Sequence, residues 1–257
     1  MNLPGVLDNG LPEGTEILVI DDCSGDQTMK EGSRAFPDVR FIHRVGEPGF
    51  CHAVNLGMSE ASGDLLLLLN NDVEPRSNAF RMLAEELESS PWYYCAAVPV
   101  IRRPDGSDES GVVYRLRRGL AVTAPGGPGI PYPSGACSLW RREAWESLGG
   151  LDTAYAPIYW EDTDIGARAF QRGLKVLKVQ KAEVLHDHAA TMGHSPGSTA
   201  LRERNRLLFT RMHFRTPPER IASALWLPLH LLKAVLTGNR AFIKGYRDFL
   251  LLMKRRR

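Results

Sequence analysis

Two acidic stretches far apart in the sequence contain residue types that could hold a metal ion and accept a proton. The first is Asn70-Asn71-Asp72, which follows the five leucines of residues 65–69. This apolar run has no polar face and predicts a short strand covered on both faces, as in a parallel sheet. In open α/β sheets ligands bind at the carboxyl edge of the strands, and an aspartate there can offer oxygens to a divalent ion that also holds phosphate. We interpret Asp72 as part of a metal and pyrophosphate site. A strand-ending turn is the alternative, because Asn and Asp are common turn residues.

The second acidic stretch is Glu-Asp-Thr-Asp, which opens a predicted helix over residues 161–172. The neighbouring Tyr159 and Trp160 suggest a partly desolvated pocket, which makes a carboxylate more basic. Acids in a first helical turn also interact favourably with the helix macrodipole, so capping alone is the alternative. Asp164 and Arg168 stand four residues apart, and we expect them to form a local ion pair.

Two further groups of residues could contact a ligand. Asp21 and Asp22 end the apolar run 17–20, which suggests that this run and the five leucines share one sheet edge. A later predicted helix contains Asn55 and Gly57, which are poor choices for a purely structural helix. This mismatch favours a functional role for Asn55, although a solvent-facing position would explain it equally well.

His186 and His188 end a predicted strand over residues 182–188. A single histidine in such a place is usually structural or exposed. Beside a metal ion at Asp72, however, an imidazole becomes a candidate second ligand, and this would suit manganese better than magnesium.

These residues are positioned by alternating strands and helices, which is typical of an α/β fold. Strands are predicted at 17–20, 39–42, 65–69, 95–101, 133–140, 174–179 and 182–188, and helices at 27–36, 51–61, 80–87, 141–147, 161–172 and 199–213. Small residues near the start of strand 133–140, including Gly135, would let a ligand approach the backbone closely. Residues 102–133 are predicted to be irregular, and a loop of this length is a candidate lid or acceptor loop.

The bulk composition is that of an ordinary soluble globular protein, with 257 residues, 43% hydrophobic and 24% charged. This length suits one large domain or one domain with an appendage. The net charge of +2 gives no sign of a nucleic-acid partner. Four scattered cysteines lack the spacing of a zinc or redox site and are expected to be reduced thiols. Without a signal peptide or an apolar run of about 18 residues, we expect a cytoplasmic protein.

Positive charge is concentrated at the C-terminus, where residues 201–257 contain fourteen Lys or Arg against three Asp or Glu. We predict a catalytic domain over 1–213 and an amphipathic, basic helical extension over 214–257. Leu225, Leu229, Leu232 and Leu236 fall on one side of this extension, and Pro228 with Lys233 excludes a membrane-spanning helix. The extension could lie on an anionic membrane surface, or pack on the catalytic domain or on a second subunit of a homodimer.

In this order the segments resemble a family 2 glycosyltransferase with the GT-A fold, close to the bacterial rhamnosyltransferase-like branch. The similarity covers about residues 16–213. It is based on five motifs, at 17–26, 49–57, 63–75, 134–152 and 160–164 with the later His186. The resemblance implies a Rossmann-like mixed sheet flanked by helices, a nucleotide-sugar donor and a Mn²⁺ or Mg²⁺ ion.

The resemblance also implies a role for each matching residue. Asp72 and His186 would hold the metal ion, and Asp162 would be the catalytic base with Glu161 beside it. Asn70 stands where the family's Asp-x-Asp signature has its first acid. The implied donor-binding residues are Asp21, Asp22, Asn55, Gly57, Asn70 and Asn71, and the implied acceptor-binding residues are Trp160 and Gly135.

The implied reaction transfers a sugar, with inversion, to a saccharide or lipid-linked acceptor during synthesis of cell-surface polysaccharide or glycoconjugate. The implied location is the cytoplasm, including the inner face of the plasma membrane. A nucleotidyltransferase is one rival, but its Gly-rich phosphate loop is not visible after the first strand. An inactive nucleotide-binding relative is the other. Family members have an additional strand and helix before residues 17–20, with that strand between 17–20 and 65–69. This sequence starts too late to contain them, and we therefore expect an incomplete donor site.

Overall fold

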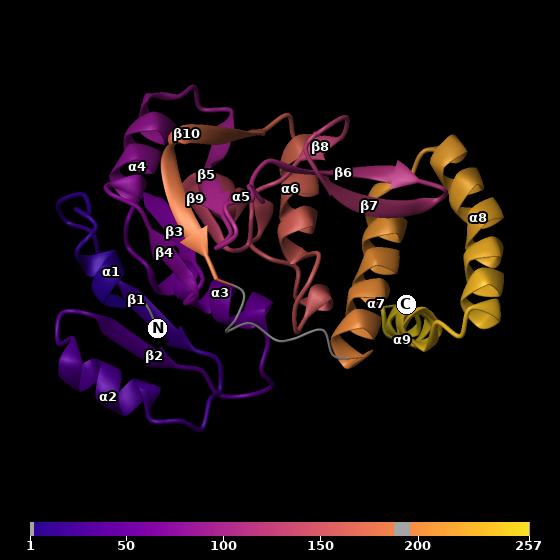
Figure 1. Cartoon of the computed structure of the whole chain (residues 1–257), viewed down its shortest axis with the longest axis horizontal. Coiled ribbons are helices and arrows are strands. Elements are labelled where there is room, and N and C mark those ends of the chain that lie inside the picture. Colours follow the sequence, from indigo (N-terminus) through magenta and orange to yellow (C-terminus); the bar gives the residue numbers. More distant parts are fainter. Residues whose placement is uncertain (1–2, 188–195, 257) are drawn as a thin grey trace.

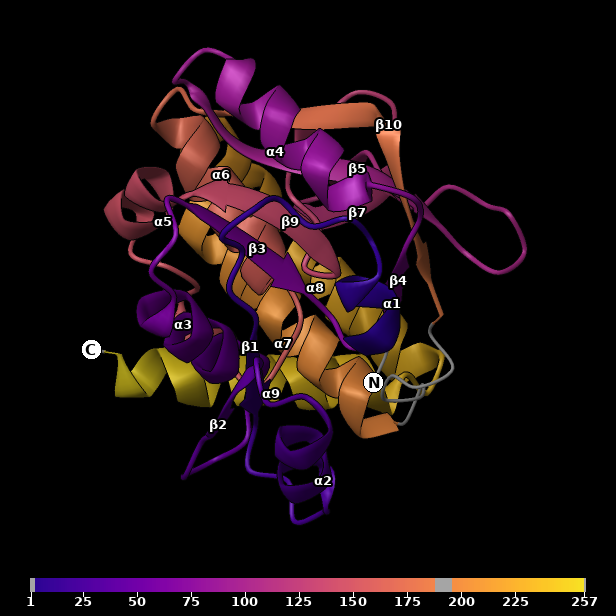
Figure 2. The same cartoon turned by 90° about the vertical axis from the view of Figure 1, so that its left-hand side faces the viewer.

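The computed structural model describes residues 3–187 and 196–256, and a five-stranded mixed sheet lies at its centre (Figures 1 and 2). The strands follow the order β3 (Leu65–Leu69), β9 (Cys137–Arg141), β5 (Tyr94–Arg102), β10 (Lys175–His186) and β4 (Val73–Pro75). Only the β5–β10 pair of this sheet is parallel, and the other pairs are antiparallel.

The five leucines form β3 as predicted, but their surroundings differ from the prediction. β3 pairs antiparallel with β9, with Leu67 opposite Leu139. Leu66 is buried, whereas the other four leucines are only half-buried. The expectation of a parallel strand covered on both faces is therefore wrong, because a continuous apolar run does not reveal the direction of the neighbouring strand.

A separate two-stranded sheet holds β1 (Leu18–Asp21) parallel to β2 (Arg40–His43). α2 (Thr28–Ala35) packs on β2, and α3 (Phe50–Glu60) packs on β1. Because β1 and β3 belong to different sheets, the prediction that they share one sheet edge is not met. Within the described residues no strand lies between them, which is the place of the additional strand in the family.

The stretch predicted to be irregular is mostly a three-stranded sheet. Its strands are β6 (Val112–Arg117), β7 (Leu120–Pro125) and β8 (Ile130–Pro131), in the order β7–β6–β8. Arg118 and Gly119 join β6 to β7 with φ of 49° and 72°, the positive values that a tight two-residue hairpin turn requires. The prediction of a 102–133 loop is wrong because arginine is not a usual residue for such a turn.

The two strands predicted at 174–179 and 182–188 are one bent strand, β10. Its first part pairs with β5, the register breaks between Val179 and Glu183, and its end pairs with β4. β10 ends at His186, and His188 lies outside the described residues.

The other predicted helices of the first 187 residues lie close to their predicted positions. They are α4 (Ala79–Ser89), α5 (Arg142–Leu148) and α6 (Glu161–Gln171). The structure adds a short helix α1 (Leu3–Leu7) and a 3-10 helix at Thr153–Tyr155. In α4 the apolar residues Phe80, Leu83 and Leu87 are buried. Gly173 follows α6 with φ of 77°, the left-handed conformation that is typical of a glycine after a helix end.

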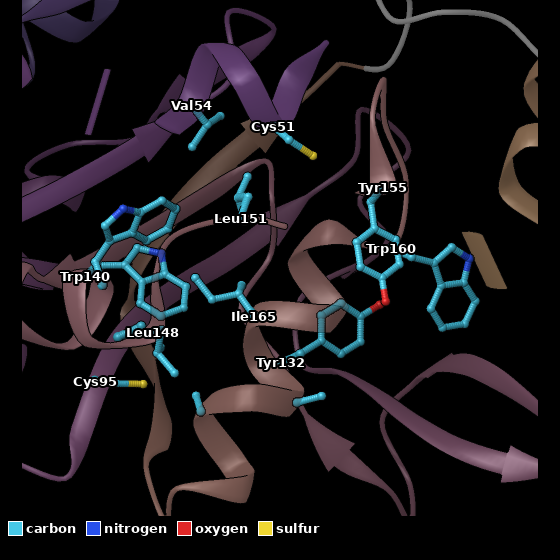
Figure 3. Close-up of a cluster of buried hydrophobic side chains, with 14 of the residues drawn as sticks. Cys51, Val54, Cys95, Tyr132, Trp140, Leu148, Leu151, Tyr155, Trp160 and Ile165 are labelled. Carbon is cyan, nitrogen blue, oxygen red and sulfur yellow. The ribbon is translucent and has the colours of Figure 1, made fainter. Parts of the chain in front are cut away.

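The largest hydrophobic core lies between the sheet, α3 and α6 (Figure 3). Trp140 of β9 is 1% exposed and meets Trp145 edge to face at 5.3 Å between ring centroids. Figure 3 shows Leu148, Leu151 and Ile165 near Trp140. This core anchors α6, so the acids of its first turn stand on a rigid base.

Three C-terminal helices, α7 (Pro196–His213), α8 (Pro217–Leu236) and α9 (Arg240–Arg255), form one end of the molecule (Figure 1). α9 lies so close to α7 that a Cβ on Gly245 would stand 2.6 Å from the carbonyl oxygen of Ala200. The extension thus packs on the rest of the chain, one of the predicted alternatives. The predicted boundary falls between α7 and α8, and the division into two domains stays a prediction. None of the described helices combines the length and apolar character needed to span a membrane.

Candidate active site

Asp162 stands in the first turn of α6, and its two carboxylate oxygens are held by backbone and side-chain donors. Oδ2 accepts a hydrogen bond from the Gly135 amide at 3.3 Å, and Oδ1 accepts bonds from the amide and hydroxyl of Thr163 at 2.6 and 3.1 Å. Burial raises the pKa of Asp162 above its ordinary value, although these hydrogen bonds oppose the shift. The structure therefore contains a fixed carboxylate with increased basicity.

The chain enters α6 through an unusual backbone conformation. Tyr159 and Trp160 have φ of 82° and 74°, the left-handed region that large side chains rarely adopt. Asn205 of α7 is fully buried, and its amide nitrogen lies 2.7, 2.9 and 2.8 Å from the carbonyl oxygens of Tyr155, Ile158 and Tyr159. One side chain thus holds the loop that leads into the acidic turn.

Trp160, predicted to contact the acceptor, packs into the core. It is 9% exposed, and its ring lies 5.0 Å from that of Phe209 on α7. The predicted neighbour Gly135, in contrast, is half-buried beside Asp162. The acceptor-binding roles of both residues stay predictions.

The other two acids of the turn have opposite environments. Glu161 is 4% exposed, and its Oε2 has no hydrogen-bond partner among residues 3–187 and 196–256. Burial, together with the charge of Asp162, raises the pKa of Glu161 strongly. Asp164 binds Arg168 at 2.8 Å, which confirms the predicted ion pair, and binds His213 at 2.6 Å. Burial alone would raise the pKa of Asp164, but His213 and Arg168 outweigh it and lower that pKa.

A small cavity lies against Asp162. Its volume is about 10 Å³, and its walls include Phe50, Leu68, Ser134 and Gly135. This space suits one water molecule and is too small for a sugar. Asp162 itself is only half-buried, so a substrate can approach it from solvent.

The carboxyl end of β3 connects this carboxylate to the first acidic stretch, Asn70-Asn71-Asp72. The amide of Asn70 donates to the carbonyl oxygen of Ala136 at 2.9 Å, and Ala136 adjoins Gly135. On the other side, the amide of Val73 closes a turn onto the carbonyl oxygen of Asn70 at 3.2 Å, which places Asp72 within that turn. Short backbone links therefore connect both predicted acids to one strand end.

Asp72 and His186 are brought together, as the metal-site prediction requires. Asp72 Oδ1 lies 3.3 Å from His186 Nε2, and His186 Nδ1 lies 2.5 Å from Glu109 Oε1. Both side chains are less than a tenth exposed. Burial by itself would lower the pKa of His186, but Glu109 and Asp72 raise it. Among the described residues, no three His, Cys, Asp or Glu side chains are grouped so as to hold a metal ion.

Asp21 and Asp22 lie at the end of β1 beside two basic residues of β2 and its following turn. Asp21 Oδ2 is 2.5 Å from His43 Nδ1, and Arg44 Nε donates to Asp22 at 2.7 Å. Burial would raise the pKa of Asp21, but hydrogen bonds from Ser24 and His43 outweigh it and lower that pKa. The other Asp22 oxygen accepts from the Gly49 amide at 2.6 Å, which links this pair to the start of α3.

Asn55 and Gly57 have structural contacts that the sequence did not indicate. The Asn55 side chain binds Leu151 twice, donating to its carbonyl oxygen at 2.8 Å and accepting from its amide at 2.9 Å. A Cβ on Gly57 would stand 3.0 Å from Ile20, so the glycine permits close packing of α3 on β1. Their proposed place in the donor pocket, like that of Asn71, stays a prediction.

Four residues that contact the site residues were not predicted from the sequence, namely His43, Arg44, Glu109 and Asn205. The first two could have been found, because the parallel register places His43 opposite Asp21. Glu109 lies in the stretch predicted to be irregular, and Asn205 lies in a C-terminal region noted only for its positive charge. Neither residue belongs to a local sequence pattern that indicates a role in the site.

Comparison with known proteins agrees with this geometry. Residues 5–149 match the family model for glycosyl transferase family 2. The N-acetylglucosaminyl-diphospho-decaprenol L-rhamnosyltransferase of Mycobacterium tuberculosis strain H37Rv is 30% identical, over 71% of this chain and 69% of that protein. GalNAc-T7, solved with UDP, GalNAc and Mn²⁺, superposes with a TM-score of 0.65 and 19% identity over 83% of this chain and 45% of its own. The mannosyltransferase PcManGT of Pyrobaculum calidifontis, solved with GDP-Man and Mn²⁺, superposes with a TM-score of 0.56 and 13% identity. This superposition covers 98% of this chain and 79% of PcManGT.

The sheet arrangement and its structural neighbours define a protein of the GT-A class, as predicted from the sequence. The chain belongs to glycosyltransferase family 2, and it is a glycosyltransferase.

Proposed function

We propose that this glycosyltransferase moves a sugar from a nucleotide-diphosphate donor to an acceptor hydroxyl, with inversion at the anomeric carbon. The observation that carries the proposal is the carboxylate of Asp162. It is fixed by Gly135 and Thr163, its pKa is raised, and the residue is only half-buried. These are the properties of a general base that must meet a substrate hydroxyl.

In the proposed reaction Asp162 accepts the proton of the acceptor hydroxyl while the oxygen attacks the anomeric carbon. The bond from that carbon to the diphosphate oxygen breaks on the opposite face, which inverts the configuration and releases the nucleoside diphosphate. The Gly135 amide fixes the orientation of Oδ2 during this step. The raised pKa of Glu161 favours its neutral form, and a neutral neighbour keeps Asp162 available as the ionised partner.

The residues at the end of β3 and β10 fit a divalent ion of the Mn²⁺ or Mg²⁺ type. Asp72 and His186 are buried with donor atoms 3.3 Å apart, and Glu109 fixes the imidazole through its other nitrogen. A carboxylate that binds the other ring nitrogen is usual for a metal-binding histidine. Two protein ligands suffice where diphosphate oxygens and water complete the coordination. Such an ion, when bound, neutralises negative charge on the departing diphosphate.

The donor side is proposed to include Asp21, Asp22, Asn70 and Asn71. Their support is position, because Asp22 contacts the Gly49 amide at the start of α3, and Phe50 of that helix lines the cavity at Asp162. The name of the mycobacterial relative describes a lipid-linked saccharide acceptor. We extend that acceptor class to this chain, which would place it on the cytoplasmic face of a membrane in cell-surface polysaccharide or glycoconjugate synthesis.

The test is release of nucleoside diphosphate from a panel of nucleotide sugars, with an acceptor present and with Mn²⁺ or a chelator. Asp162→Asn should lower turnover by about 10²- to 10⁴-fold while nucleotide binding persists. Glu143→Gln, which alters an exposed acid of α5, is the matched control and should keep its activity. Nucleotide binding without turnover by the unmodified protein would instead favour the inactive binding relative.

A further inference from the structure

The outer side of α8 exposes a row of large apolar residues. Its members are Ile221, Leu225, Leu229, Leu232 and Leu236, here called the α8 apolar face, and they are 59%, 67%, 53%, 56% and 77% exposed. Their spacing of three and four residues places them on one side of the helix. A contiguous exposed patch of this kind is typical of an interaction site rather than of a free surface.

The opposite side of α8 packs against the rest of the protein. Leu227, Leu231 and Ala234 join the hydrophobic cluster with α7 and α9, and Ser223 donates to the carbonyl oxygen of Gly119 at 2.8 Å. Figure 1 shows α8 along the outer edge of the molecule, with α7 and the β6–β7 hairpin on its inner side. The α8 apolar face therefore points away from the protein.

The C-terminal segment that contains this face has a strong excess of positive charge. Residues 214–257 contain ten Lys or Arg and two Asp or Glu, whereas the whole chain has a net charge of +2. Every Lys and Arg of residues 214–256 is exposed. The two acids are already engaged, since Glu219 caps the start of α8 and Asp248 pairs with Lys244 at 2.6 Å.

This charge distribution distinguishes between two occupants of the face. A second copy would bring two positive surfaces together, and like charges in contact oppose association. An anionic lipid surface complements the positive charge and accepts the leucines into its headgroup and acyl boundary. Trp226, 37% exposed under the guanidinium of Arg118 at 5.7 Å, adds an aromatic residue of the kind found at membrane interfaces.

We infer that α8 lies flat on an anionic bilayer through its apolar face, with the exposed Lys and Arg of α8 and α9 contacting lipid headgroups. α8 has 20 residues and is about 30 Å long, but Pro228 interrupts it and it is not apolar enough to cross the membrane. The inference deepens the proposed function, because a lipid-linked acceptor would be presented at such a surface.

The experiment is co-sedimentation of the full chain with large vesicles, either of phosphatidylcholine alone or with one part phosphatidylglycerol to two parts phosphatidylcholine. We expect binding to the anionic vesicles only, and loss of binding when salt is raised from about 0.1 M to 1 M. The double variant Leu225→Ser, Leu232→Ser should need at least about tenfold more anionic lipid for half-binding. Both leucines are exposed, so the fold should persist.

The matched control is Trp92→Ser with Phe170→Ser, which removes apolar side chains that are 78% and 52% exposed on other parts of the surface. This control should bind vesicles like the unmodified protein. The inference is overturned if the unmodified protein does not bind anionic vesicles, or if the α8 and control variants bind alike. A stable dimer that the α8 variant dissociates would also overturn it, in favour of self-association.

Transfer to a soluble acceptor without vesicles separates this inference from the proposed function. The α8 double variant should retain that transfer, because it changes no residue near Asp162. Failure of transfer by all proteins would contradict the proposed function but not the vesicle result, which requires neither donor nor acceptor.

Discussion

The amide of Gly135 lies 3.3 Å from Asp162 Oδ2, so the segment that leads into β9 and the first turn of α6 are joined at the carboxylate. A Cβ on Gly135 would stand 3.6 Å from the same oxygen, an ordinary contact that leaves the backbone unchanged. It would, however, occupy space beside the atom that must meet the acceptor hydroxyl. Gly135 is thus suited both to orient the carboxylate and to leave room for a substrate.

Gly135→Ala should consequently fold normally but bind the acceptor less well. We expect the KM for the acceptor to rise several-fold, with the KM for the donor unchanged and with a change in unfolding free energy below about 1 kcal/mol. Initial rates at varied acceptor and donor concentrations, with urea unfolding, measure these quantities. An unchanged acceptor KM would show that the acceptor does not pass this oxygen.

The pH dependence of transfer should report the environment of Asp162. Because burial raises its pKa, the acid limb of kcat/KM should have its midpoint above the ordinary aspartate value of about 3.9. Below that midpoint Asp162 is protonated and cannot accept the hydroxyl proton, so kcat/KM should fall about tenfold per pH unit. Circular dichroism at each pH verifies that the protein remains folded. A midpoint at or below the ordinary value is incompatible with this environment.

Glu161 should make the protein less stable as pH rises. Its folded pKa is raised above the unfolded value of about 4.3, so the folded state holds an extra proton between the two values. Stability from this group is therefore present below the unfolded pKa and is lost as pH rises through the folded pKa. Glu161→Gln removes this effect.

The measurement is urea unfolding of both proteins at several pH values. The variant should gain about 1.4 kcal/mol over the unmodified protein per pH unit within that window. A cost of burying the Gln amide does not depend on pH, so it shifts the difference in unfolding free energy by the same amount at every pH. Glu143→Gln, at an exposed acid, should give a flat difference. A difference for Glu161→Gln that does not change with pH would refute the assignment of a strongly raised pKa.

The parts of the site that local sequence determines were predictable. The apolar run 65–69 forms a strand, acids open α6, and Asp164 pairs with Arg168 because four residues make one turn of a helix. Residues brought together by tertiary contacts were not. Glu109 meets His186 across 77 residues, and no local pattern marks such a pair. The order of strands in the sheets was equally hidden, since apolar runs do not specify their neighbours.

Asn205 is another residue whose contacts local sequence does not reveal, and it leads to a further prediction. Its fully buried amide lies within hydrogen-bond distance of three carbonyl oxygens of residues 155–159, the loop that enters α6. The left-handed backbone at Tyr159 and Trp160 is costly, and such conformations persist only where surrounding contacts hold them. We therefore expect Asn205 to position Asp162 without touching a substrate.

Asn205→Ala should lower kcat by at least about tenfold, because loss of these contacts lets the first turn of α6 shift, and should destabilise the fold by about 1–3 kcal/mol. Thr210→Val is the matched control: Thr210 is a buried residue of the same helix whose hydroxyl accepts from the Ala121 amide at 2.9 Å, away from this loop. It should cost comparable stability but leave kcat near normal. The two variants are compared by steady-state rates and urea unfolding at one temperature. Equal kcat values at equal stability loss would reduce Asn205 to a packing residue, whereas a selective fall in kcat assigns it the orientation of the catalytic turn.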